Sequence, residues 1–112
     1  GPKRMSSKHR WLAFTGKVKG TLVVDEGAAQ ALLQDGKSLL PAGVRKVFGA
    51  FSMGDMLEVQ DPQGRPIARG LCNYATEAVE SIRGYTSTEI ERKLGHQAFD
   101  EVIHRDNLVI LE

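Results

Sequence analysis

The sequence predicts one small domain, built mainly of β-strands with short α-helices. Its 112 residues fit a single domain, and 41% hydrophobic and 26% charged residues are ordinary values for a globular protein. The 12 glycines fall at intervals between short apolar runs, which is typical of a small β structure with many turns. Three segments carry apolar residues at helical spacing instead, and these segments are the predicted helices.

The first half of the chain begins with two predicted strands, at residues 11–14 and 20–24. Asp25 is then placed to cap a helix over 26–34, and Gly36 is placed to end it. Its apolar residues recur at helical spacing: Ala28, Ala29, Leu32 and Leu33.

The segment SLLPAGV comes next and is predicted to reverse the chain. Pro41 ends any extension of the leucines before it, and Gly43 permits a tight reversal. A strand is expected to resume over 44–47, and FSMGD, at 51–55, is expected to be a turn.

A β-hairpin over residues 56–72 is the clearest local pattern. MLEVQ, at 56–60, alternates apolar and polar residues as a half-buried strand does. Asp61, Pro62 and Gly64 stand at the first, second and fourth positions expected of a type I turn. IARGLC, at 67–72, is then the returning strand.

Two short helices follow the hairpin. Thr76 is predicted to cap the first, over 77–83, with Gly84 as its stop. In the second, TSTEIERKL, Thr86 and Glu89 have the spacing of a capping box, and Ile90 and Leu94 share one face. On these helix surfaces Glu80–Arg83 and Glu89–Lys93 have the spacing of ordinary exposed ion pairs.

The chain ends in HRDNLVILE, whose apolar run NLVIL predicts a final strand covered on both faces and central in its sheet. The letters His104-Arg105-Asp106 also open the catalytic loop of protein kinases. There, an asparagine five positions after the aspartate holds magnesium, whereas here that position is Leu111. Because no G-x-G-x-x-G or G-x-x-x-x-G-K-[ST] loop occurs either, we assign this tripeptide no catalytic role.

No catalytic, cofactor-binding or metal-binding residue is predicted. Glu101 and His104 have E-x-x-H spacing, but a di-iron bundle needs two such motifs on long helices, so a solvated turn is the better interpretation. The scattered aromatic residues are expected to pack in or beside the core, and two methionines to fill gaps there: Trp11, Phe14, Tyr74, Tyr85, Met53 and Met56.

Charge is distributed unevenly along the chain. Residues 1–20 hold six basic residues and no acid, whereas the remainder holds nine basic and 14 acidic residues, a net charge of −5. This basic arm is interpreted as a solvated linker, with contact to phosphates as the alternative. Gly1-Pro2 is typical of an expression scar, so we assign 1–7 to scar and linker and 8–112 to the domain. A lone Cys72 and the lack of a long apolar run favour a cytoplasmic protein without membrane contact.

Seven segments in order resemble the C-terminal region of bacterial glutamate 5-kinases, which is a PUA domain. They are KHRWLAF, VDEGAAQALL, SLLPAGV, FSMGD, IARGL, TSTEIERKLG and VIHRDNLV. The resemblance implies a PUA-like pseudo-barrel. It also implies a parent enzyme that phosphorylates the side-chain carboxylate of glutamate with ATP and magnesium, in proline biosynthesis.

The resemblance places the catalytic residues in a separate amino-acid-kinase domain of the same polypeptide, which would be this domain's partner, in a parent expected to be a homo-oligomer. The isolated chain is therefore expected to be inactive, without a cofactor, and to serve in packing or regulation. RNA binding is the alternative, because PUA relatives hold RNA at positions corresponding to Gly43, Val44, Arg45 and Lys46, with His104 or Arg105. A stand-alone interaction protein is a third interpretation.

Overall fold

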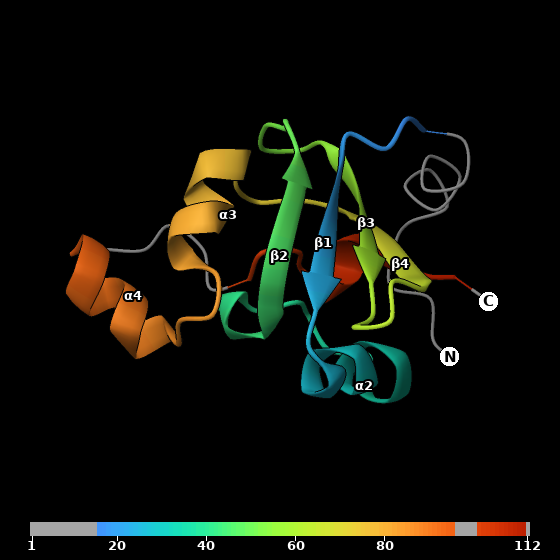
Figure 1. The fold of residues 1–112 in the computed structure, drawn as a ribbon, viewed down its shortest axis with the longest axis horizontal. Helices are drawn as coiled ribbons and strands as arrows, with labels where there is room; N and C mark the ends of the chain where they lie inside the picture. The colour runs from blue at the N-terminus through green and yellow to red at the C-terminus, as the bar shows by residue number, and fades with distance from the viewer. Residues whose placement is uncertain (1–15, 96–100, 112) are drawn as a thin grey trace.

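A five-stranded mixed sheet forms the centre of the molecule. The computed structural model describes residues 16–95 and 101–111. The sheet order is β2-β1-β3-β4-β5, with β1 and β3 parallel and the other pairs antiparallel (Figure 1). The strands are β1 Gly20–Val24, β2 Val44–Gly49, β3 Met56–Gln60, β4 Pro66–Leu71 and β5 Leu108–Ile110. The predicted class, mainly β with short helices, is confirmed; the strand predicted over 11–14 lies outside the described residues.

Helix α2, Glu26–Asp35, begins and ends as its sequence predicts. The Asp25 carboxylate accepts a hydrogen bond from the Ala28 N–H at 2.7 Å, and Gly36 ends the helix with a φ of 60°. The predicted helical spacing is confirmed; Leu32 is buried, whereas the Leu33 side chain is 48% exposed. A short 3₁₀ turn, η1 (Pro41–Gly43), then leads into β2.

The hairpin of β3 and β4 is confirmed, and Asp61 organises its turn. The Asp61 N–H donates to the Arg65 carbonyl at 3.0 Å, and the Asp61 carbonyl accepts from the Gly64 N–H at 2.9 Å. The Asp61 carboxylate also accepts from the Gln63 and Arg65 N–H groups. These bonds satisfy the backbone of the turn locally, which is why the sequence predicts it well.

Helix α3, Thr76–Ile82, starts differently from the prediction. Thr76 is its first helical residue, and the N-cap is Ala75, which makes no side-chain cap bond. The Thr76 hydroxyl instead accepts from the Phe51 N–H at 2.7 Å, and the Thr76 N–H donates to the Phe51 carbonyl. Thr76 therefore attaches α3 to the end of β2, a role that local spacing does not reveal.

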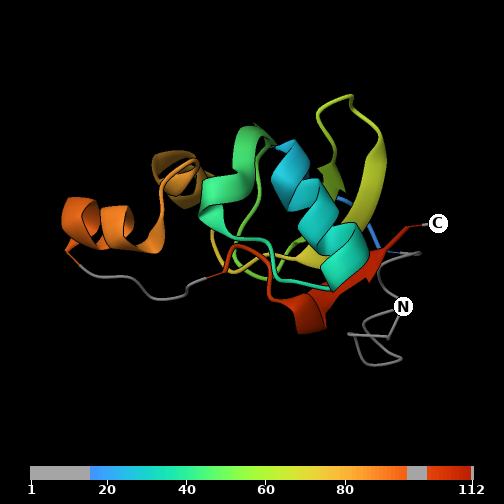
Figure 2. The same ribbon diagram turned by 90° about the horizontal axis from the view of Figure 1, so that it is seen from below.

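Helix α4, Ser87–Leu94, has the predicted capping box between Thr86 and Glu89. Ile90 is buried, whereas Leu94, one turn further on, is 45% exposed. The predicted Glu89–Lys93 pair is also wrong: the Glu89 carboxylate accepts from Thr86, and Lys93 contacts Tyr85, 4.8 Å from the ring centroid. Figures 1 and 2 both place α4 at one end of the molecule, beyond α3.

The last strand, β5, was predicted to be central, and this was wrong. Among the described residues it pairs with β4 alone, at the edge of the sheet. Its burial was predicted correctly, since Leu108 belongs to the main core and Val109 to a second apolar cluster. A continuous apolar run indicates that both faces of the strand are buried, and a strand at the edge of a sheet can be buried on both faces too.

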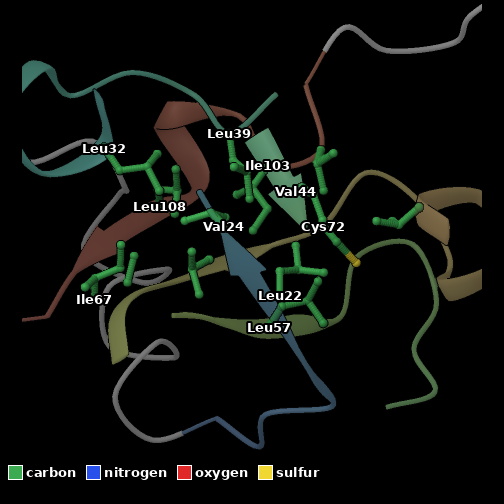
Figure 3. Packing of buried hydrophobic residues seen from close by; sticks show 14 of the residues in the cluster. Leu22, Val24, Leu32, Leu39, Val44, Leu57, Ile67, Cys72, Ile103 and Leu108 are labelled. Atoms are coloured by element: carbon green, nitrogen blue, oxygen red, sulfur yellow. The ribbon is translucent and has the colours of Figure 1, made fainter. Parts of the chain in front are cut away.

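The main core lies between the inner face of the sheet and α2. Leu22, Leu57 and Val59 are fully buried in this core. Figure 3 shows Leu22 and Leu57 packed with residues from several elements. Tyr74 packs against this core as expected. Of the two methionines, Met56 is buried, but Met53 is 65% exposed, so its predicted gap-filling role was wrong. Trp11 and Phe14 lie outside the described residues.

Candidate binding surface

The six residues predicted for a binding surface lie on two segments, 43–46 and 104–105. A single β-bridge between Leu39 and Ile103 holds the segments that precede them side by side. The Leu39 N–H donates to the Ile103 carbonyl at 2.9 Å (Figure 3 shows the two residues together). The Arg105 N–H also donates to the Ser38 hydroxyl at 2.7 Å. The structure therefore joins the two segments through residues 38 and 39.

Gly43 is required for close packing. A Cβ atom added to it would lie 2.5 Å from the Ala28 Cβ, far inside normal contact distance. Its carbonyl accepts from the Asp25 N–H at 2.9 Å, so it links the start of α2 to the start of β2. The chain reverses here through the η1 turn, and Gly43 is not among the glycines with positive φ.

The backbone amides at this turn are already used. The Gly43 N–H donates to the Leu40 carbonyl at 3.1 Å, and the Val44 N–H donates to the Pro41 carbonyl. Val44 itself has no exposed surface and faces the core. A phosphate at this place would therefore have to bind the exposed side chains of Arg45 and Lys46 rather than an amide nest.

Arg45 occupies a β-bulge. Val24 pairs with Val44 and Val23 pairs with Lys46, which leaves Arg45 as the extra residue of β2. Its carbonyl accepts from the Arg83 guanidinium at 2.7 Å. The bulge is thus held by the end of α3, while the Arg45 side chain stays exposed.

Arg83 is itself fixed by a second contact. Its Nε donates to the Glu80 carboxylate at 2.7 Å, which is the i,i+3 pair that the sequence predicts. Both side chains are nearly half exposed, so this ion pair contributes little stability alone. Its effect is to orient the guanidinium toward the β2 edge.

The tripeptide at 104–106 forms a small capped turn. The Asp106 N–H donates to His104 Nδ1 at 3.0 Å, which places His104 as the N-cap of η2, Arg105–Asn107. Nδ1 also lies 3.6 Å from the Asp106 carboxylate, but a nitrogen that accepts the amide bond carries no proton for an ion pair. These residues therefore have a structural function in the turn before β5, and Arg105 remains exposed.

The charges near this surface are mixed. The Asp25 carboxylate is occupied as the α2 cap, whereas Glu26 stands exposed in the first turn of that helix. Of the basic arm, the described residues include Lys17 and Lys19, both exposed, but Lys19 lies beside Gly49 at the other end of β2. This balance gives an anion a weaker field than a uniformly basic face would provide.

The residues that organise the surface were not predicted. Ser38, Leu39 and Arg83 join segments far apart in sequence through backbone groups, and no local pattern marks such contacts. Among the described residues, no cluster of three or more His, Cys, Asp or Glu side chains could hold a metal ion. Across the same residues, no helix has the length and apolar character needed to span a membrane.

Comparison with known proteins places these features in a family. Residues 20–94 match the model of the PUA domain. Glutamate 5-kinase from Caldanaerobacter subterraneus subsp. tengcongensis is 56% identical over 108 residues, which cover 96% of this chain. Those residues are 29% of that enzyme, so the chain spans less than a third of the relative's length.

Solved structures give the same result for the fold. The PUA domain from Aeropyrum pernix K1, solved as a tartrate complex, superposes with a TM-score of 0.55 at 28% identity. This match covers 78% of our chain and 43% of that one. A chain of the archaeal box H/ACA sRNP Nop10–Cbf5 complex superposes with a TM-score of 0.54. The match covers 90% of our chain and 26% of that one. At 12% identity, that likeness concerns the fold alone.

Proposed function

This chain belongs to the PUA domain family, and on that basis we propose that it is the C-terminal accessory domain of a glutamate 5-kinase. The observation that carries the proposal is 56% identity across nearly the whole chain to an enzyme more than three times as long. Identity at this level over nearly the whole chain supports a shared role.

In this proposal the parent polypeptide transfers the γ-phosphoryl group of ATP to the side-chain carboxylate of glutamate, with magnesium, in the cytoplasm. The chemistry takes place in the kinase domain that precedes this one. Phosphoryl transfer needs a cradle for the nucleotide phosphates and bound metal ions. The sequence has neither phosphate-loop motif, which supports an accessory rather than a catalytic role. The domain acts by packing against the kinase domain and by shaping the oligomer or its regulation.

The test compares this chain with the full-length polypeptide encoded by its gene. Each is incubated with glutamate, ATP and magnesium, and γ-glutamyl phosphate is trapped with hydroxylamine as the hydroxamate. We expect product from the full-length protein and none from this chain. Turnover by the chain alone, or a full-length polypeptide without glutamate-dependent turnover, would refute the proposal.

RNA binding is a second candidate, and the exposed side chains of Arg45, Lys46 and Arg105 favour it. Two arginines and a lysine can each contact a phosphate, with the arginines bidentate. A gel-shift titration with structured RNA at two salt concentrations tests it, with Arg45→Glu as the variant. Arg65→Glu, on the exposed hairpin turn, is the matched control. If Arg45→Glu and the control bind equally, the surface proposed here is not an RNA site.

A further inference from the structure

The outer face of the sheet, opposite the core, carries an ordered row of residues. Strand register aligns one residue from each strand in the order β2, β1, β3, β4, β5, and directly opposed residues share a face. The row is Phe48, Thr21, Glu58, Arg69 and Val109. A second row beside it holds Lys46, Val23 and Gln60.

The two halves of this outer face differ in how they are covered. Over β3, β4 and β5, Met56 and Val109 are each only 6% exposed, and Val18 and Leu71 pack against them. Over β1 and β2, by contrast, Thr21 and Val23 are half-buried and Phe48 is 54% exposed. Removing a phenylalanine side chain from water is favourable, so the exposed Phe48 makes the β1–β2 half an apolar surface that a partner can cover.

The chain enters the described structure beside this face. The Lys19 N–H donates to the Met56 carbonyl at 2.8 Å, and Val18 packs on the Met56–Val109 cluster. The described part of the chain therefore begins beside the outer face of the sheet. A short tether holds a preceding domain at a high effective concentration next to its attachment point.

We propose that the preceding kinase domain of the same polypeptide docks on the β1–β2 half of the outer face. This inference rests on the proposed function, because it takes that domain as the occupant. Phe48 enters an apolar site on the kinase domain. Lys46 contacts an acidic side chain there, because its own row, with Val23 and Gln60, contains no carboxylate.

The charged residues at the centre of the outer face are consistent with docking at the β1–β2 half. Glu58 and Arg69 stand directly opposite each other on β3 and β4, where opposite charges on one face attract. The Glu58 carboxylate also accepts a hydrogen bond from Gln60 Nε2 at 2.8 Å, so its charge is engaged within the outer face. The partner is therefore matched to Lys46 and Phe48 at the β2 side. The partner's surface is accordingly apolar at its centre with an acidic group at its margin.

The test measures the reaction rate of an introduced thiol in two forms of the protein. Phe48→Cys and Met53→Cys are each made in this chain and in the full-length polypeptide, and alkylation is followed by peptide mass mapping. Met53 is the matched control, because it is an exposed apolar side chain in the turn after β2. The native Cys72 reacts slowly, since it is buried with its Sγ donating to the Ser52 carbonyl, and burial raises the pKa of the thiol.

We expect both introduced thiols to react at similar rates in the isolated chain. In the full-length polypeptide, a docked state populated about 90% of the time would slow Phe48→Cys about tenfold and leave Met53→Cys unchanged. Equal rates for Phe48→Cys in both forms would overturn the inference. Protection that disappears on dilution would overturn it too, because a second copy rather than the tethered domain would then cover the face.

Hydroxamate formation by the full-length polypeptide keeps the two proposals separate. A full-length polypeptide that lacks activity refutes the proposed function, whereas an active one whose Phe48→Cys thiol is unprotected refutes only the docking. Phe48→Asp provides an independent measurement. It should increase the radius of gyration of the full-length polypeptide in X-ray scattering, with Met53→Asp as control, and no change would contradict the docking.

Discussion

The sheet with α2 and the pair of helices α3 and α4 are stabilised in different ways. In the sheet region, fully buried side chains such as Leu22 and Leu57 belong to one continuous cluster. In α4, Ile90 is the buried residue, and the helix is defined by a capping box at its start and Gly95 at its end. The sheet region should therefore unfold as one unit, whereas α4 can open locally at a smaller free-energy cost.

Leu57→Ala should have the largest effect, because it removes a side chain with no exposed surface from the core. We expect the free energy of unfolding to fall by about 2–5 kcal/mol, measured by urea denaturation. Met53→Ala, at an exposed site, should change it by less than about 0.5 kcal/mol. A similar loss for both variants would mean that burial does not distinguish these sites.

Thr76→Val tests the junction between the two regions. The change leaves the Phe51 N–H without its acceptor, which should cost about 1–3 kcal/mol in the free energy of unfolding. Thr88→Val, on the exposed side of α4, is the matched control and should be nearly neutral. If the two variants unfold at the same urea concentration, α3 does not depend on this contact.

Features that depend on residues close in sequence were predicted correctly, whereas features that depend on distant contacts were not. The α2 caps, the Asp61 turn and the Thr86–Glu89 box involve residues only a few positions apart, and all three are found as predicted. The edge position of β5 and the Thr76–Phe51 bond depend on the whole topology, and there the predictions were wrong. Short-range patterns specify how an element starts and stops, but not which neighbour it meets.

The candidate surface was predictable to a similar degree. Exposure of Arg45, Lys46 and Arg105 was expected of charged residues, and the resemblance drew attention to Gly43. The bulge and its Arg83 contact could not be predicted, because they arise from the pairing of β1 with β2. The exposure of Phe48 was also not foreseen, since an aromatic residue in a strand ordinarily predicts burial.

Thr86→Ala should act on α4 and leave the sheet unchanged. Loss of an N-cap costs about 0.5–2 kcal/mol, and here it should appear as faster amide hydrogen exchange within α4. Exchange in β1 and β3 should not change. Ser87→Ala is the control, and faster exchange across the whole domain would contradict the independence of α4.

Glu89→Gln should give the smallest effect, one that depends on pH. Hydrogen bonds from Thr86 lower the pKa of the Glu89 carboxyl group, so its ionised form stabilises the folded helix. This contribution is present above the ordinary carboxyl pKa and is lost as the pH falls through the lowered value. Amide exchange in α4 should therefore differ between wild type and variant near neutral pH and converge in acid. A difference that is independent of pH would contradict this assignment.

Helix α3 also protects the edge strand β2 against pairing with strands of other molecules. Its first residue bonds to the chain just after β2, and Arg83 beyond its end occupies the Arg45 carbonyl. An uncovered edge strand presents unpaired N–H and C=O groups to which strands of other molecules can bind, and repeated addition leads to aggregates. Because these contacts occupy backbone groups of Phe51 and Arg45, they hinder the addition of a foreign strand along β2. Phe48 can therefore stay exposed for a partner at a lower risk of aggregation.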